Sequence, residues 1–224
     1  MDRLQRTRAL IGDAAVARLT RATVMVVGCG AVGSVATEAL ARTGIGHLVL
    51  IDFDRVQESN INRQLIATQS TVGMPKVDAA RARIADLDPN IAVDTFDIFF
   101  DDKTDIDVHP DFVIDAIDSI PSKIALYKWC AARNIAFIAS MGAARKTDTS
   151  KIKTATIYQT SVCPLAARVR KLARQESLAD FPVVFSTETA RDLGPGNTLG
   201  SMMPVTGTFG FALANFVINK IAGI

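Results

Sequence analysis

The chain has 224 residues, of which 49% are hydrophobic and 21% charged, and its formal net charge is +2. This composition excludes intrinsic disorder, collagen and a highly charged coiled coil. The length favours one large α/β domain over two small ones. The three cysteines lie far apart with no C-x-x-C pair, so the sequence predicts neither a zinc site nor a disulfide framework. Because the first residues also lack the apolar core of a signal peptide, we expect a protein of the reducing cytoplasm.

Up to about residue 142 the hydrophobic pattern alternates between predicted strands and predicted helices. The strands are expected at Thr23–Val27, His47–Ile51, Ile91–Phe96, Phe112–Ile114 and Ala136–Ser140, and the helices at Val32–Arg42, Lys76–Leu87 and Lys123–Arg133. This order predicts an α/β fold with a Rossmann-like, doubly wound, mostly parallel sheet.

The pattern changes in the last third of the chain. Here we expect an antiparallel strand at Lys151–Ile157, a basic helix at Leu165–Gln175, a short strand at Val183–Ser186, a loop at Asp192–Gly200 and a last helix at Thr206–Ile221. We therefore predict a single domain over residues 1–224. Residues 1–142 would form a nucleotide-binding half with an N-terminal arm, and residues 143–224 a C-terminal extension for substrate and dimer contacts.

The apolar stretch Met202–Ile224 raises the question of a membrane helix. Its uninterrupted apolar part, Phe209–Ile218, is shorter than the ~20 residues that a span requires. We therefore predict a buried or interface helix and no stable membrane span, with peripheral membrane association left open. Because this segment is apolar on nearly every face, it needs cover on all sides, which favours a homodimer.

Gly28, Gly30 and Gly33 form a G-x-G-x-x-G motif between a predicted strand and a predicted helix. Gly28 allows a tight turn, Gly30 lets the backbone approach a phosphate, and Gly33 allows close packing of helix and strand. Asp52 follows Gly33 by 52 − 33 = 19 residues, the position of an acid that binds a ribose. The motif predicts a bound nucleotide without distinguishing NAD, FAD, S-adenosylmethionine and ATP.

The residues after Asp52 favour ATP. An enzyme that adenylates its substrate must neutralise charge on the departing pyrophosphate, and Arg63 and Lys76 supply two cations for this, with Asn60 and Gln64 as neutral donors. A dehydrogenase, the alternative from another enzyme class, rarely needs such a cluster. A non-catalytic nucleotide-sensing scaffold is a further alternative, which the intact set disfavours.

The carboxylate that would hold Mg²⁺ comes from the segment V-I-D-A-I-D-S. Asp118 is the preferred ligand, and Asp115, three residues earlier, is its rival.

Five segments in this order, V-x-G-x-G-x-V-G, I-D-F-D, N-x-N-R-Q, G-x-x-K and D-A-x-D-S, resemble the ubiquitin-activating-enzyme-like adenylyltransferases over essentially the whole chain. The resemblance implies ATP binding by Asp52, Asn60, Arg63, Gln64 and Lys76, with magnesium on Asp118. It also implies an N-terminal arginine that reaches the partner subunit's ATP site. Arg6 fits that role best, and Arg3 and Arg8 are its alternatives.

Later segments, among them P-L-A-A-R-V-R and V-F-S-T-E, resemble the branch of tRNA threonylcarbamoyladenosine dehydratases. This implies ATP-dependent adenylation of a carboxylate on a modified adenosine in tRNA, followed by ring closure. The other branch activates the C-terminus of ubiquitin-like sulfur-carrier proteins. It usually carries zinc-binding C-x-x-C pairs, which this chain lacks, so we expect ATP and Mg²⁺ but no zinc. A carrier-protein or sulfur-relay partner stays open.

A basic helix face is the candidate tRNA contact, comprising Arg168, Arg170, Lys171 and Arg174. Arg145 and Lys146 are candidates to extend it. The chain departs from the dehydratase pattern at Val183, where a cysteine is common, and at Cys163, where an acid is more usual. Cys163 has two interpretations, packing or a reactive thiol.

Overall fold

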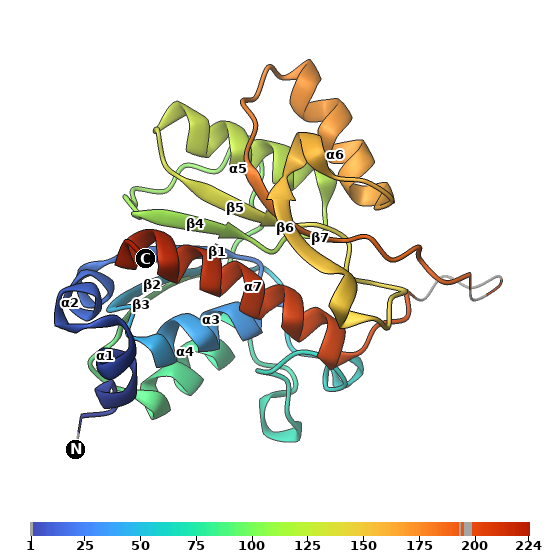
Figure 1. Ribbon diagram of the computed structural model, residues 1–224. Helices are drawn as coiled ribbons and strands as arrows, with labels where there is room; N and C mark the ends of the chain where they lie inside the picture. Colours follow the sequence, from blue (N-terminus) through green and yellow to red (C-terminus); the bar gives the residue numbers. More distant parts are fainter. Residues whose placement is uncertain (1, 193, 195–198) are drawn as a thin grey trace.

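The computed structural model describes residues 2–192, 194 and 199–224 and shows one seven-stranded sheet with helices on both faces (Figure 1). The strands are β1 (Thr23–Val27), β2 (His47–Ile51), β3 (Ala92–Phe96), β4 (Phe112–Asp115), β5 (Phe137–Ser140), β6 (Ile152–Thr156) and β7 (Pro182–Ser186). Their order in the sheet is β3-β2-β1-β4-β5-β7-β6, and every neighbouring pair is parallel except β6–β7. The predicted fold class, including the antiparallel pair in the extension, is confirmed.

Seven α-helices lie among the described residues. They are α1 (Gln5–Ile11), α2 (Asp13–Arg21), α3 (Gly33–Thr43), α4 (Lys76–Leu87), α5 (Ile120–Ala132), α6 (Pro164–Gln175) and α7 (Met203–Ala222). Four short 3-10 turns occupy Glu58–Asn60, Gln69–Thr71, Thr149–Lys151 and Ile157–Gln159. The expected loop at Asp192–Gly200 lies partly outside the described residues.

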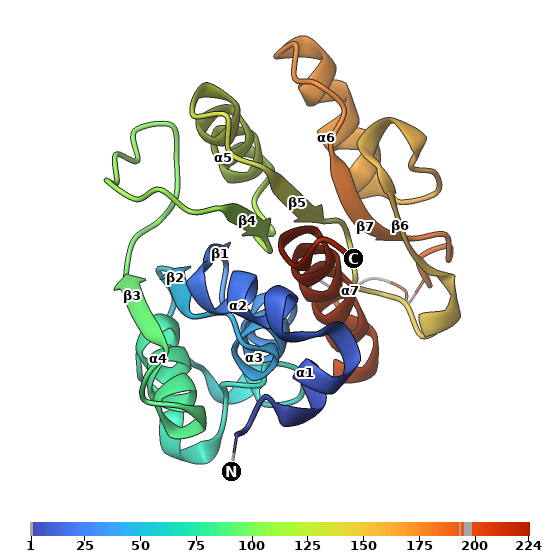
Figure 2. The ribbon, with the colours of Figure 1, turned by 60° about the vertical axis from the view of Figure 1, so that its left-hand side comes forward.

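Two apolar cores, one on each face, hold the helices to the sheet. On one face α2, α3, α4 and α7 pack together, and on the other α5 and α6 do (Figure 2). The central strand β1 supplies Val24 and Val26 to the first core, and Met25 and Val27 to the second. This alternation follows from the pleat of a strand covered on both faces.

Most predicted boundaries lie within one residue of those in the structure, the starts of α5 and α7 differ by three, and two helices were missed. α5 begins at Ile120 and α7 at Met203, earlier than expected, and each has a proline in its first turn, where a missing N–H costs nothing. α6 likewise begins on Pro164. The missed helices are α1 and α2. α1 has no buried residue within its span, so it lacks the apolar periodicity that would have revealed it.

Among the described residues, α7 is the one helix long and apolar enough to cross a membrane by length and composition. It packs instead along α3 and over the sheet, and 56% of its most apolar stretch is buried. The protein's own helices and sheet thus cover just over half of this stretch, and the homodimer stays a prediction. Two large apolar residues of α7 are exposed, Phe211 by 60% and Met203 by 37%.

Candidate functional site

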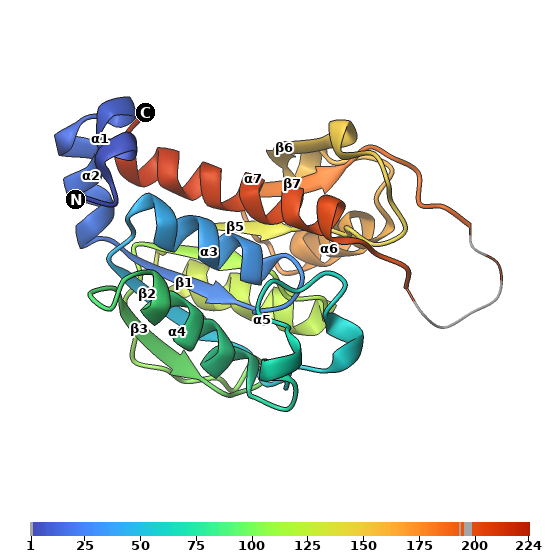
Figure 3. The ribbon, with the colours of Figure 1, turned by 90° about the horizontal axis from the view of Figure 1, so that it is seen from below.

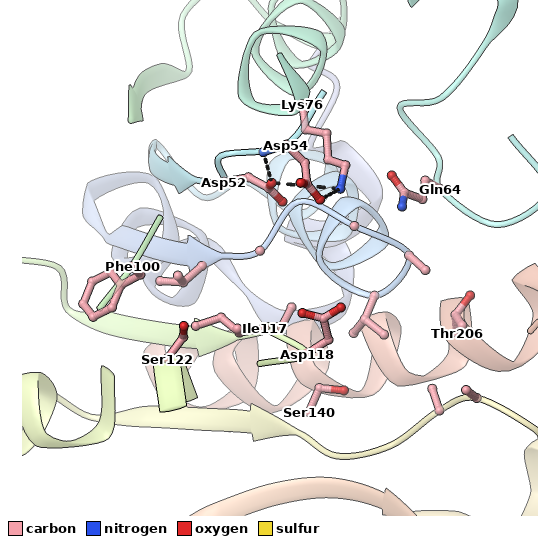
Figure 4. Close-up of a pocket in the computed structure, with 18 of the residues that line it drawn as sticks. Asp52, Asp54, Gln64, Lys76, Phe100, Ile117, Asp118, Ser122, Ser140 and Thr206 are labelled. Atoms are coloured by element: carbon pink, nitrogen blue, oxygen red, sulfur yellow. Dashed lines mark hydrogen bonds and ion pairs between the residues drawn. The ribbon is translucent and has the colours of Figure 1, made fainter. Parts of the chain in front are cut away.

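A cavity of about 460 Å³ opens at the carboxyl ends of the parallel strands. It lies between the ends of β1 and β4, where the strand order reverses and where open α/β sheets bind their ligands. In Figure 4, Asp52, Asp54 and Lys76 lie together on one side of the glycine turn, and Asp118 and Ser140 on the other. The residues that line it from the predicted set are Gly28, Gly30, Asp52, Arg63, Gln64, Lys76 and Asp118.

The backbone at the three glycines is compatible with the roles that the motif predicts. Gly28 has a φ of +95°, and an added Cβ there would lie 2.7 Å from the carbonyl oxygen of Ala116. At Gly33 a Cβ would come within 1.7 Å of the carbonyl oxygen of Gly28, so α3 can approach the turn only because Gly33 has no side chain. Gly30 faces open space instead, with the Gln64 amide 3.8 Å from the added atom. The turn therefore leaves room for a phosphate at Gly30.

Asp52 is held rigidly at the end of β2. Its carboxylate accepts a hydrogen bond from the Cys29 N–H at 2.6 Å and another from the Asp54 N–H at 2.9 Å. Burial raises the pKa of Asp52 above its ordinary value, while Lys76 and the two backbone donors oppose this effect. The side chain is thus a fixed acceptor on the cavity wall, as a ribose hydroxyl requires.

Lys76, at the start of α4, is buried between two carboxylates. Its Nζ lies 2.6 Å from Asp54 and 4.0 Å from Asp52. Asp54 is a site residue that we did not predict, although the repeated acid in I-D-F-D was the available signal. Arg63 has no carboxylate partner among the described residues; its guanidinium donates to the carbonyl oxygen of Ser59 and to the side-chain oxygen of Asn62. The two cations therefore differ: Lys76 is paired, whereas the Arg63 guanidinium has only neutral partners among the described residues.

Gln64 and Asn60 are both buried, but only Gln64 lines the cavity. Its Oε1 atom has no hydrogen-bond partner among the described residues, so the amide is available to a ligand. The Asn60 side chain instead accepts the Gln57 N–H at 3.1 Å and closes the 3-10 turn before Arg63. The structure therefore does not bring Asn60 into the cavity lining, and its visible contact is local.

Asp118 and Asp115 have opposite surroundings. Asp118 is exposed, lines the cavity and has no hydrogen bond or ion pair with the described residues. Asp115 is fully buried, with Lys123 and Tyr127 on its carboxylate. Of the two rivals, only Asp118 is therefore free to hold a cation. No cluster of three or more His, Cys, Asp or Glu side chains suited to a metal occurs in the described part of the chain. One carboxylate suffices for Mg²⁺ when phosphates supply further ligands.

The far end of the cavity is built by the end of β5 together with the extension, and its residues were not predicted. Its lining comes from the end of β5 and the starts of α6 and α7, including Ser140, Gly142, Ala143, Ala144, Leu165 and Thr206. These residues carry no charge, so the charged side chains from the predicted set in the cavity lining are Asp52, Arg63, Lys76 and Asp118. No short motif connects these residues, because three separate elements bring them together.

Arg6, the candidate for action in a partner subunit, is exposed on α1, where no hydrogen bond or ion pair to the described residues is found. Arg3 and Arg8, its alternatives, are engaged with Asp88 and with Asp2 and Asp13. Figure 3 shows α1 at the opposite end of the parallel strands from the points of their arrows. Arg6 therefore lies away from the cavity of its own chain.

The basic face of α6 is smaller than predicted. Arg168, Lys171 and Arg174 are exposed, and the Arg174 guanidinium lies 5.1 Å from the centre of the Tyr158 ring. Arg170 instead donates to the carbonyl and hydroxyl oxygens of Thr160, at 2.8 and 2.5 Å. Arg170 thus fixes the turn before α6.

Two further candidates lie inside the protein. Lys146 is buried and donates to the carbonyl oxygen of Glu188 at 2.8 Å, so it does not extend the basic surface. Cys163 is 3% exposed and does not line the cavity, which supports the packing interpretation over a reactive thiol.

The model of the ThiF family matches residues 4–224. A tRNA threonylcarbamoyladenosine dehydratase of Bacillus subtilis is 44% identical, over 84% of this chain and 76% of its own length. The Escherichia coli enzyme of the same name is 34% identical, over 96% of this chain and 91% of its own.

Two solved structures of the Escherichia coli dehydratase, in complex with AMP and with ATP, superpose with TM-scores of 0.93 and 0.92. Both comparisons cover 99% of this chain and 94% of the other, at 34% identity. A molybdopterin-synthase adenylyltransferase of Escherichia coli is 34% identical over 51% of this chain and 47% of its own. The chain belongs to the ThiF family.

Proposed function

We propose that this chain is an ATP-dependent tRNA threonylcarbamoyladenosine dehydratase. One observation carries the proposal: Asp52, Gln64, Lys76, Arg63 and Asp118 all line one cavity beside the glycine turn. The similarity of nearly the whole chain to dehydratases, including one with bound ATP, supports the same conclusion.

The first step is adenylation of the substrate. A carboxylate oxygen on the modified adenosine attacks the α-phosphorus of ATP, and pyrophosphate leaves with the bonding electrons. Arg63 and Lys76 neutralise the charge that grows on the leaving group, and Gln64 contributes a neutral hydrogen bond. Asp118 would hold a Mg²⁺ ion, which supplies further charge neutralisation at the phosphates when bound. Asp52 fixes the ribose.

The second step closes the ring. A nitrogen of the substrate's own side chain attacks the acyl-adenylate carbonyl and loses its proton, and AMP leaves with the bonding electrons. The protein mainly positions these groups, so no protein nucleophile is required. The buried state of Cys29 and Cys163 agrees with this scheme, and burial raises the pKa of Cys29 far above its ordinary value.

We propose that tRNA contacts the exposed side of α6 through Arg168, Lys171 and Arg174. The helix that carries these three cations begins at the cavity, where Leu165 forms part of the wall. Phosphate contacts of this kind position a nucleic acid without reading its sequence. We also place the enzyme in the cytoplasm, where its three free cysteines meet a reducing environment.

We further propose a homodimer in which Arg6 of each subunit completes the cavity of the other. Two features support it: Arg6 has no partner among the described residues of its own chain, and it lies far from its own cavity. The exposed Phe211 on α7 offers an apolar contact for a twofold interface.

The test is release of AMP and pyrophosphate from ATP with three acceptors. These are tRNA carrying threonylcarbamoyladenosine, the same tRNA without the modification, and a ubiquitin-like carrier protein ending in glycine. We expect AMP and a cyclised nucleoside only with the modified tRNA. Turnover only with the carrier protein would replace the proposal with carrier-protein activation. Calorimetry should show that ATP binds in the presence of Mg²⁺ and that NAD does not bind. Micromolar NAD binding without ATP binding would refute both the dehydratase and the carrier-protein activation.

A further inference from the structure

A charged network lies completely buried beneath the cavity, and the proposed chemistry does not use it. Asp115 at the end of β4, with Lys123 and Tyr127 of α5, has no exposed surface. The Lys123 Nζ lies 2.7 Å from the Asp115 carboxylate, and the Tyr127 hydroxyl donates to the same oxygen at 2.5 Å. The surrounding core is apolar and aromatic, with Phe137 stacked on Tyr127.

Such a pair is a poor means of stabilising a fold. Removing two charges from water costs several kcal/mol for each ion, and apolar residues of similar volume are often at least as stable. The Tyr127 pKa is raised, chiefly by burial and then by the Asp115 charge, so its hydroxyl stays protonated as a donor. Because its charges are fully paired, the network is better suited to fixing the geometry of the segments that it joins than to stabilising the fold.

The network ends on segments that line the cavity. The other oxygen of Asp115 accepts the Ile117 N–H at 2.9 Å, and Lys123 also donates to the carbonyl oxygen of Ser140 at 2.7 Å. Ile117, Ser140 and Asp118 all line the cavity, and Asp118 directly follows Ile117. Figure 4 shows Ile117, Asp118 and Ser140 on the same wall. One buried pair thus ties the loop after β4 to the end of β5.

We propose that Asp115, Lys123 and Tyr127 are positioning residues for the nucleotide reaction. They hold the loop that carries Asp118 at a fixed distance from Ser140, so that the backbone at Asp118 is already in place when the Mg²⁺–ATP complex binds. This inference rests on the proposed function of Asp118. It gives Asp115, which the sequence offered as the alternative Mg²⁺ ligand, a role without contact with the metal.

The experiment compares Lys123→Met and Tyr127→Phe with a matched control, Glu38→Gln. Glu38 is also buried and ion-paired, to Arg42 and Arg83, but it does not line the cavity. Binding of ATP is measured by calorimetry with Mg²⁺ and with a chelator, below the melting temperature of each variant. This readout needs no tRNA, so it stands even if the proposed reaction is wrong.

We expect Mg²⁺ to strengthen ATP binding by the wild type and by Glu38→Gln equally. In Lys123→Met the Mg²⁺-dependent gain should fall by about tenfold, and in Tyr127→Phe by about threefold, since each loses a hydrogen bond to a charged group. ATP affinity in the chelator should stay unchanged.

With the modified tRNA, the same two variants should lose kcat more than they raise KM for ATP. If both keep the wild-type gain and kcat while folded, the proposal is overturned. Should Lys123→Met fail to fold, Tyr127→Phe decides alone. If wild-type protein binds ATP with Mg²⁺ but forms no AMP with the tRNA, only the proposed reaction fails.

Discussion

At the scale of single residues, Lys76 and Arg63 carry the same charge but lie in different surroundings. Lys76 is buried between Asp52 and Asp54, so it contributes both to the site and to the stability of the α4 start. Arg63 is half-buried and bonded to neutral oxygens only among the described residues. The sequence suggested the same role for both cations. In the structure only Lys76 is paired with carboxylates, so we expect the two to differ in their effect on stability.

Substitution should show this difference. Arg63→Ala and Lys76→Ala should each lower AMP formation by roughly 10²–10³, about 2.7–4 kcal/mol, as removal of an oxyanion-hole donor does. Only Lys76→Ala should also lower the melting temperature, because it leaves two carboxylates close together without their cation. Rate assays and thermal unfolding of the two variants check this. Activity of both within a few-fold of wild type would mean that the phosphates bind elsewhere.

Cys163 is the residue whose chemistry the structure constrains most clearly. It is buried behind the cavity wall, with its Sγ 3.4 Å from the position of a Cβ added at Gly142. Cys163→Ser should therefore leave cyclisation nearly intact, at the cost of some stability from a buried hydroxyl. If this variant still forms the adenylate but releases no cyclic product, a covalent thioester step belongs in the mechanism.

At the scale of elements, the basic side chains of α6 have two different surroundings: Arg168 and Lys171 are exposed, whereas Arg170 is bonded to Thr160. Arg168→Glu and Lys171→Glu should weaken tRNA binding and reduce its salt dependence, because each removes a phosphate contact. Arg170→Ala should instead lower the melting temperature, since Thr160 loses its partner. Filter binding across a salt series, beside thermal unfolding, separates the two effects. An unchanged salt slope in both charge-reversal variants would move the tRNA to another surface.

At the scale of the whole molecule, the composite site predicts complementation. Arg6→Ala and Lys76→Ala homodimers should each be nearly inactive. In a mixed dimer one cavity is intact and the other carries both changes, so activity should return to half of the wild-type value at best. AMP formation after subunit exchange is the measurement. A monomer in sedimentation, or no recovery despite exchange, would remove the shared site and leave the ATP chemistry standing.

The sequence by itself determined the parallel half of the sheet, because each buried strand is a short apolar run bounded by turns, and Val27 and Ile51 are followed by residues typical of a nucleotide site. It also predicted the glycine turn at Gly28 and Gly33, with Asp52 and Lys76 nearby, since a motif and its backbone geometry are local, and the structure places Gly28, Asp52 and Lys76 in the lining of one cavity. The division of the chain near residue 142 stays a prediction.

Only the tertiary structure decided the rest. It distinguished Asp118 from Asp115, placed Asn60 outside the cavity lining, buried Lys146 and tied Arg170 to a turn. Each of these outcomes depends on which distant element packs against the residue, and a linear pattern does not encode that. The same reason explains why α1 was missed and why the uncharged end of the cavity carries no motif: burial there is a property of the assembled sheet and helices, not of the segment.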